Sequence, residues 1–104
     1  MSVVKELLAS GDVNAKDAYG STVLIHAAAN GHRELVRYLV KHTNADVDAQ
    51  DSENGCTALW RAAEKGRLDL VRFLFDEAGA DVEARDKSGR TALIASAENG
   101  HVDV

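Results

Sequence analysis

The 104-residue sequence contains no proline and only one cysteine. Cys56 has no second cysteine in the chain with which to form a disulfide, which is typical of proteins in a reducing compartment. The absence of proline removes a common marker of linkers and domain boundaries. We therefore expect one domain over residues 1–104, located inside the cell, in the cytoplasm or the nucleus.

Long apolar runs are also absent, since no stretch approaches the roughly 18 residues of a membrane-spanning helix. The short apolar pair Val3-Val4 near the start is not a secretory signal. Twelve basic residues against seventeen acidic residues give a net charge of −5, which argues against a general affinity for nucleic acids. We expect neither a membrane nor a nucleic acid as a partner.

The sequence does contain a repeat, and its clearest copy runs from Gly55 to Asp86. A shift of 35 residues brings an earlier set of residues into register with Gly55, Thr57, Leu59, Ala62, Ala63, Gly66 and Val71: these are Gly20, Thr22, Leu24, Ala27, Ala28, Gly31 and Val36. A shift of 34 residues in the other direction adds Gly89, Thr91, Leu93, Ala97 and Gly100. Self-similarity at such a period indicates stacked supersecondary units.

Each unit has the pattern of two short helices and a loop. Thr57 is a suitable N-cap for a helix over residues 58–64, and Gly66 is suited to the turn that follows. A second helix is predicted over residues 68–77, followed by a tight finger over residues 80–84. The predicted buried stripe of the second helices consists of Leu70, Val71, Leu74 and Phe75, matched by Leu35, Val36, Leu39 and Val40.

These residues resemble the ankyrin repeat, whose pattern is T-P-L-H-x-A-A, then G-H, V-x-x-L-L and G-A-D-V-N-A. The first run matches residues 22–28, 57–63 and 91–97, and the last matches residues 12–15, 45–49 and 80–84. The resemblance implies an all-α solenoid of stacked helix-turn-helix pairs with short β-hairpin-like fingers. It divides the chain into a half repeat (1–16), two repeats (17–50 and 51–85) and a further half repeat (86–104).

The sequence departs from the family pattern at two positions of the first run. Val23, Ala58 and Ala92 replace the proline, and Ile25, Trp60 and Ile94 replace the histidine. We expect apolar packing instead of the family's polar link, with Trp60 in the core or between repeats. The second finger is one residue longer, at Ser52-Glu53-Asn54.

The resemblance also implies a non-catalytic protein–protein interaction module, a scaffold, adaptor or targeting segment. Such modules bind partners through the fingertips and the exposed side of the first helices. The matching positions here are Tyr19, Ser21, Asn30, Gln50, Ser52, Asn54, Cys56, Glu64, Lys65, Arg85, Lys87, Ser88, Arg90, Glu98 and Asn99. Tyr19 is the strongest candidate, because exposed aromatic residues dominate interface energies. Arg85, Lys87 and Arg90 would suit an acidic or phosphorylated partner, although the simpler interpretation is a solvated finger whose charges aid solubility.

No catalytic, cofactor or metal site is expected. The four histidines lack the spacing of metal ligands, and Asp51 occupies the position where a calcium loop needs glycine. Asp17, Asp51 and Asp86 are expected to hold turns. Cys56 is expected beside a fingertip as a surface or contact residue. Asn14 matches a position at which ankyrin-like fingers can carry a hydroxylated asparagine, but Asp48 and Glu83 stand there in the other fingers.

Two alternatives to simple partner binding stay open. The first segment, with Val3, Val4, Leu7 and Leu8, has the buried pattern of a second helix, whereas residues 92–104 contain a first helix whose second helix is incomplete. This arrangement is expected of a fragment of a longer array, or of a unit that assembles head to tail with its own copies. The other alternative is a regulatory or targeting segment of a larger enzyme.

Overall fold

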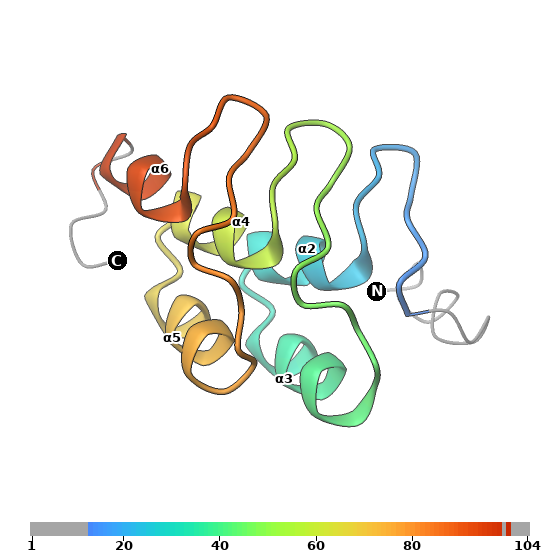
Figure 1. Ribbon diagram of the computed structural model, residues 1–104. Helices are drawn as coiled ribbons and strands as arrows, with labels where there is room; N and C mark the ends of the chain where they lie inside the picture. The colour runs from blue at the N-terminus through green and yellow to red at the C-terminus, as the bar shows by residue number, and fades with distance from the viewer. Residues whose placement is uncertain (1–12, 99, 101–104) are drawn as a thin grey trace.

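The chain folds into two rows of short helices joined by long loops (Figure 1). The computed structural model describes residues 13–98 and residue 100. The helices of these residues are α2 (Val23–Ala29), α3 (Arg33–His42), α4 (Ala58–Glu64), α5 (Leu68–Asp76) and α6 (Ala92–Glu98). The described residues contain no strand, so this part of the chain is all-α as predicted. The predicted helix over residues 3–10 lies outside the described residues.

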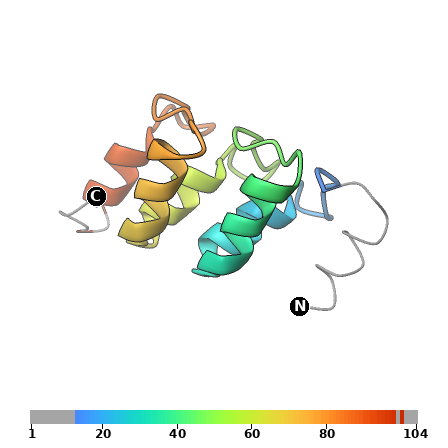
Figure 2. The same ribbon diagram turned by 90° about the horizontal axis from the view of Figure 1, so that it is seen from below.

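Helices α2, α4 and α6 form an inner row, and α3 and α5 form an outer row (Figures 1 and 2). Within each repeat α2 packs against α3 and α4 against α5, while α4 also packs against both α2 and α6. The Cα atoms extend over 38 × 24 × 21 Å. This is the stacked solenoid that the periodicity predicts.

The inner helices begin and end where the sequence indicates. The hydroxyl groups of Thr22 and Thr57 accept hydrogen bonds from the backbone N–H groups of Ile25 and Trp60, at 3.3 and 3.1 Å. Gly66 follows α4 with a φ of 69°, a left-handed conformation that glycine adopts without steric cost. The chain therefore turns sharply from the inner row into the outer row.

Small side chains close the interface between the inner helices. Ala27, Ala28, Ala62 and Ala63 are at most 2% exposed. Because a methyl group occupies little space, neighbouring helices can approach closely at these positions. Trp60 fills the family's histidine position and is 3% exposed, which confirms its predicted packing. Its indole Nε1 donates a hydrogen bond to the carbonyl of Arg90 at 3.0 Å, so a polar link to the next finger is also present.

The buried stripe of α5 differs from the prediction at two positions, since Val71 is only half-buried and Phe75 is exposed. Leu70, Phe73 and Leu74 are buried, whereas Phe75 is 53% exposed. Residues 70, 73 and 74 share one face at helical spacing, and Phe75 lies on the side that faces away from α3. The sequence pattern assigned the wrong phenylalanine to the core. On α3 Val36 and Leu39 are buried as expected, whereas Leu35 and Val40 are only half-buried against the core.

The fingers are turns rather than paired strands in the described residues. Each is closed at its base by a main-chain hydrogen bond, in which the N–H of Asp17, Asp51 or Asp86 donates to the carbonyl of Ser21, Cys56 or Arg90 at 2.9–3.0 Å. In the first and third fingers, the N–H groups of Gly20 and Gly89 also donate to the carbonyls of Asp17 and Asp86 at 2.9 Å. The middle finger spans one residue more than its neighbours, as its sequence predicts. The division into repeats at residues 17, 51 and 86 stays a prediction.

Candidate partner-binding surface

Main-chain hydrogen bonds join the three fingertips to one another. The backbone N–H of Ser52 donates to the carbonyl of Tyr19 at 3.1 Å, and that of Lys87 donates to the carbonyl of Asn54 at 2.7 Å. These bonds link residues more than 30 positions apart in the sequence. The fingers consequently stand side by side along one edge of the stack (Figure 1).

An aspartate at the start of each finger holds its turn, as predicted. One carboxylate oxygen of Asp17 accepts hydrogen bonds from the N–H groups of Tyr19 and Ser21. The equivalent donors are Asn54 and Cys56 for Asp51, and Ser88 and Arg90 for Asp86. Burial alone would raise the pKa of each carboxyl, but these bonds stabilise the charged form and hold all three pKa values below the ordinary 3.8.

The second carboxylate oxygen of each aspartate lies within hydrogen-bonding distance of a cationic or ionisable side chain. His26 Nε2 lies 2.5 Å from Asp17, and Arg61 Nη2 lies 2.9 Å from Asp51. His26 and Arg61 stand at the same repeat position, the variable x of the first run. The third repeat has Ala95 there, which has no cationic group.

Arg90 supplies the missing charge in the third repeat from a different position. Its Nε lies 3.2 Å from Asp86, and its Nη1 lies 3.1 Å from Glu98 at the end of α6. The guanidinium groups of Arg61 and Arg90 both lie over the ring of Trp60, each 5.7 Å from its centroid. Arg90 is thus one member of a network that braces the finger against the inner helices.

Most of the predicted contact residues are accessible. Tyr19 has the largest exposed aromatic surface on the fingers, at 65%. The other exposed members are Asn30, Gln50, Ser52, Asn54, Lys65, Arg85, Lys87, Ser88 and Glu98, and Glu64 and Arg90 are half-buried. Asn99 lies outside the described residues.

Two predicted contact residues are not accessible, and this corrects the sequence interpretation. Ser21 is 8% exposed and Cys56 is 0% exposed. Both immediately precede the N-cap threonine, where the chain passes from the finger into the core. Loss of solvent raises the pKa of the Cys56 thiol to about 12, so the thiolate is not formed at neutral pH. Cys56 is part of the buried core and not an exposed fingertip residue.

The basic residues of the third finger are partly engaged within the protein. Arg85 Nη1 donates to the carbonyl of Gly89 at 2.9 Å, and Lys87 Nζ donates to the carbonyl of Ser52. Both side chains remain exposed and retain further N–H donors. Arg85 and Lys87 are therefore available to an anionic partner, whereas Arg90 is already paired with two carboxylates.

The ends of the inner helices continue the surface below the fingers. Asn30 Nδ2 donates to the carbonyl of His26 at 2.8 Å, and Glu64 accepts from Arg61 at 3.2 Å. Glu98 accepts from Arg90 in the next repeat. Asn30, Glu64 and Glu98 are thus each held by a residue of their own repeat.

Side-chain hydrogen bonds also join the bases of successive fingers. The side chain of Asn14 accepts from the N–H of Asp46 at 2.6 Å and donates to the carbonyl of Asn44 at 3.2 Å. Asp48 accepts in the same way from the N–H of Asp81 at 2.8 Å. Asn14 and Asp48, at the same repeat position, thus each tie one finger to the next.

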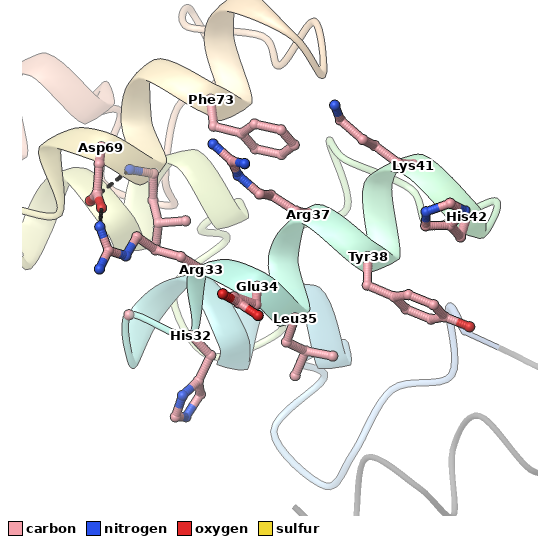
Figure 3. Close-up of a pocket in the computed structure, with 12 residues that line it drawn as sticks. His32, Arg33, Glu34, Leu35, Arg37, Tyr38, Lys41, His42, Asp69 and Phe73 are labelled. Carbon is pink, nitrogen blue, oxygen red and sulfur yellow. Dashed lines mark hydrogen bonds and ion pairs between the residues drawn. The ribbon is translucent and has the colours of Figure 1, made fainter.

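The sequence interpretation missed a hollow on the outer row. A cavity of about 890 Å³ is lined by residues of α3 and by Asp69, Leu70 and Phe73 of α5 (Figure 3). Arg33 and Arg37 extend from α3 towards Asp69 and Phe73 in this view. Charged residues four apart on α3 were the signal that could have indicated these contacts.

Within residues 13–98 and 100, no group of three His, Cys, Asp or Glu side chains is placed to hold a metal ion. No helix of the same residues has the length and apolar character needed to cross a membrane.

Comparison with known proteins identifies the family. A family model described as "Ankyrin repeats (3 copies)" matches residues 1–86 and 44–104, which together cover the whole chain. Ankyrin repeat domain-containing protein 29 of Danio rerio is 44% identical over 52 residues, which are 48% of this chain and 17% of that protein. Ankyrin repeats are generally non-catalytic modules of protein–protein interaction. The chain belongs to the ankyrin repeat family.

Proposed function

We propose that this chain is a non-catalytic module that binds a protein partner through its three fingertips and the adjoining ends of the inner helices. The main support is the pair of hydrogen bonds that join Tyr19 to Ser52 and Asn54 to Lys87. They give the exposed tips one fixed arrangement before a partner arrives. A preformed surface binds at a lower ordering cost than a flexible one.

The chemistry of the surface favours a partner with both an apolar contact and acidic groups. Tyr19 offers an exposed aromatic side chain on the first finger, and Arg85 and Lys87 offer positive charge on the third. Aromatic residues and arginines contribute most of the energy in many interfaces. We also propose that the partner is a protein of this chemistry and that the chain acts inside the cell.

Two exposed tyrosines provide a matched test of the surface. Tyr19 lies on a fingertip and is 65% exposed, while Tyr38 lies on the outer helix α3 and is 50% exposed. We would capture partners from a cell extract with the wild-type chain, Tyr19→Ala and Tyr38→Ala. A partner of the finger surface should bind Tyr19→Ala about 10- to 30-fold more weakly. Its affinity for Tyr38→Ala should be unchanged.

The opposite pattern, with binding lost in Tyr38→Ala and kept in Tyr19→Ala, would contradict the proposed face. Equal unfolding midpoints for the three proteins are the control for folding. A second comparison, Arg85→Ala against Arg72→Ala, tests the charge on the third finger in the same way. Arg90 is a poor choice for this test, because removing it leaves the Asp86 carboxylate without its cation.

A second candidate function is self-assembly, and one observation favours it. Leu93 is 67% exposed, whereas Leu24 and Leu59 at the equivalent positions are 1% and 2% exposed. An apolar surface of this kind is a common site of association.

A further inference from the structure

An apolar groove lies at the end of the stack, beside α5 and α6. Its volume is about 350 Å³. It is lined by Leu59, Leu68, Val71, Arg72, Phe75, Asp76, Val82, Ala92 and Leu93. Phe75, Val82 and Leu93 are 40–67% exposed in it. Among the described residues, no outer-row helix follows α5 to cover these side chains (Figures 1 and 2).

The contact between α3 and α5 shows how one outer helix receives the next. Arg33 Nη1 lies 2.7 Å from Asp69, and the Arg37 guanidinium lies 5.6 Å from the centroid of the Phe73 ring (Figure 3). Lys41 Nζ lies 3.6 Å from Glu77. Three residues spaced by four on α3 thus meet three residues with the same spacing on the following helix.

The repeat register places Leu68, Arg72 and Asp76 of α5 at the positions of those three α3 residues, 35 residues later. This side of α5 also borders the groove. Arg72 is exposed, and within residues 13–98 and 100 it forms no ion pair. A helix that filled the groove in the manner of α5 on α3 would therefore place its central residue opposite Arg72.

One segment of this sequence has the required pattern. Residues 3–8 are Val-Val-Lys-Glu-Leu-Leu, which align with Leu-Val-Arg-Tyr-Leu-Val at 35–40 and Leu-Val-Arg-Phe-Leu-Phe at 70–75. All three segments have apolar residues at positions one, two, five and six and a basic residue at position three. The fourth position is Glu6 in the first segment and Tyr38 and Phe73 in the others, and Phe73 is the residue that meets Arg37.

We propose that the groove binds residues 3–8 of a second copy of this chain, with Glu6 of that copy paired to Arg72. The proposal deepens the self-assembly candidate and is independent of binding at the fingertips. The carboxylate of Glu6 and the guanidinium of Arg72 are complementary in charge. Val4, Leu7 and Leu8 would cover the exposed apolar side chains of the groove. Because head and tail are different surfaces, the contact is heterologous and can add further copies.

Charge reversal tests this pairing by sedimentation velocity over a wide range of protein concentration. The wild-type chain should increase in mass with concentration. Arg72→Glu and Glu6→Arg should each weaken self-association about 10- to 100-fold, because like charges would face one another. A mixture of the two single variants should assemble with the two variants alternating, because each contact then pairs opposite charges, and the double variant Arg72→Glu/Glu6→Arg should recover assembly on its own.

Two controls separate this result from others, and two outcomes would overturn the proposal. Tyr19→Ala should assemble like the wild type, so loss of fingertip binding and loss of assembly can be told apart. Circular dichroism should show the same helical signal for every variant. A wild-type chain that stays monomeric at all concentrations would overturn the proposal, including the case in which the chain's own residues 101–104 fill the groove. Assembly that ignores both charge reversals would overturn it as well.

Discussion

The three finger glycines provide a graded test of how closely successive fingers approach. Gly20, Gly55 and Gly89 occupy equivalent positions, with φ values of 73°, 73° and 82°. Alanine at any of them is held in a left-handed conformation, which costs about 1–2 kcal/mol. This shared cost is offset by about 0.4–1 kcal/mol, because alanine lowers the conformational entropy of the unfolded chain relative to glycine.

The contacts of the added methyl group distinguish the three sites. A Cβ at Gly20 would lie 2.6 Å from the backbone nitrogen of Ser52 and 1.9 Å from its hydroxyl oxygen. At Gly55 the methyl would lie 3.3 Å from the backbone nitrogen of Lys87, and at Gly89 no described atom is within 4 Å. Overpacking against backbone adds about 1–3 kcal/mol at Gly20. It adds a few tenths of a kcal/mol, roughly, at Gly55.

Gly20→Ala should therefore lower the free energy of unfolding by about 2–4 kcal/mol and Gly89→Ala by about 1 kcal/mol or less. Gly55→Ala should lie between them. Urea unfolding followed by circular dichroism measures all three values on the same scale. Equal losses at the three sites, or a larger loss for Gly89→Ala than for Gly20→Ala, would show that the fingers do not contact one another as described.

Three further predictions concern the core and its ionisable groups. Leu59→Ala should lower the free energy of unfolding by about 2–5 kcal/mol, because Leu59 is only 2% exposed. Leu93→Ala should lower it by under about 1 kcal/mol, because Leu93 is 67% exposed. Chemical denaturation of both variants measures the two losses. Cys56 should react with a thiol reagent at pH 7 only after unfolding, so labelling at equal rates in native and unfolded protein would contradict its burial. Asp51 has a lowered pKa, so its contribution is present above the ordinary value of 3.8 and is lost as the pH falls through the folded value. Asp51→Asn should flatten the acid limb of the stability curve below about pH 4, and an unchanged limb would refute the role of its hydrogen bonds.

Local signals in the sequence were sufficient to predict the helices. The threonine cap and the glycine stop predicted α4 over residues 58–64, which is the range that the structure shows. The second helix was predicted over residues 68–77, and α5 ends one residue earlier. Periodicity then placed α2, α4 and α6 in one row, because each copy must bury the same face.

Contacts between repeats could not be predicted from the sequence in the same way. Cys56 occupies a position that is serine in one finger and arginine in another, so its residue type gave no indication of burial. Phe73 and Phe75 are the same residue type and lie two positions apart on α5. Only the packing of α3 against α5 determines which of the two is buried. The ion pairs of Asp51 with Arg61 and of Asp86 with Arg90 depend on how each finger folds back over its inner helix.

Hydrogen–deuterium exchange of the chain, alone and bound to a captured partner, tests the shared binding face most directly. Binding at the fingertips should slow exchange in all three fingers together, over residues 17–21, 51–56 and 86–90. Exchange in α3 should stay unchanged. Slowed exchange confined to α3 and α5, with none in the fingers, would contradict the proposal that the aligned tips form the surface that this module presents to its partner.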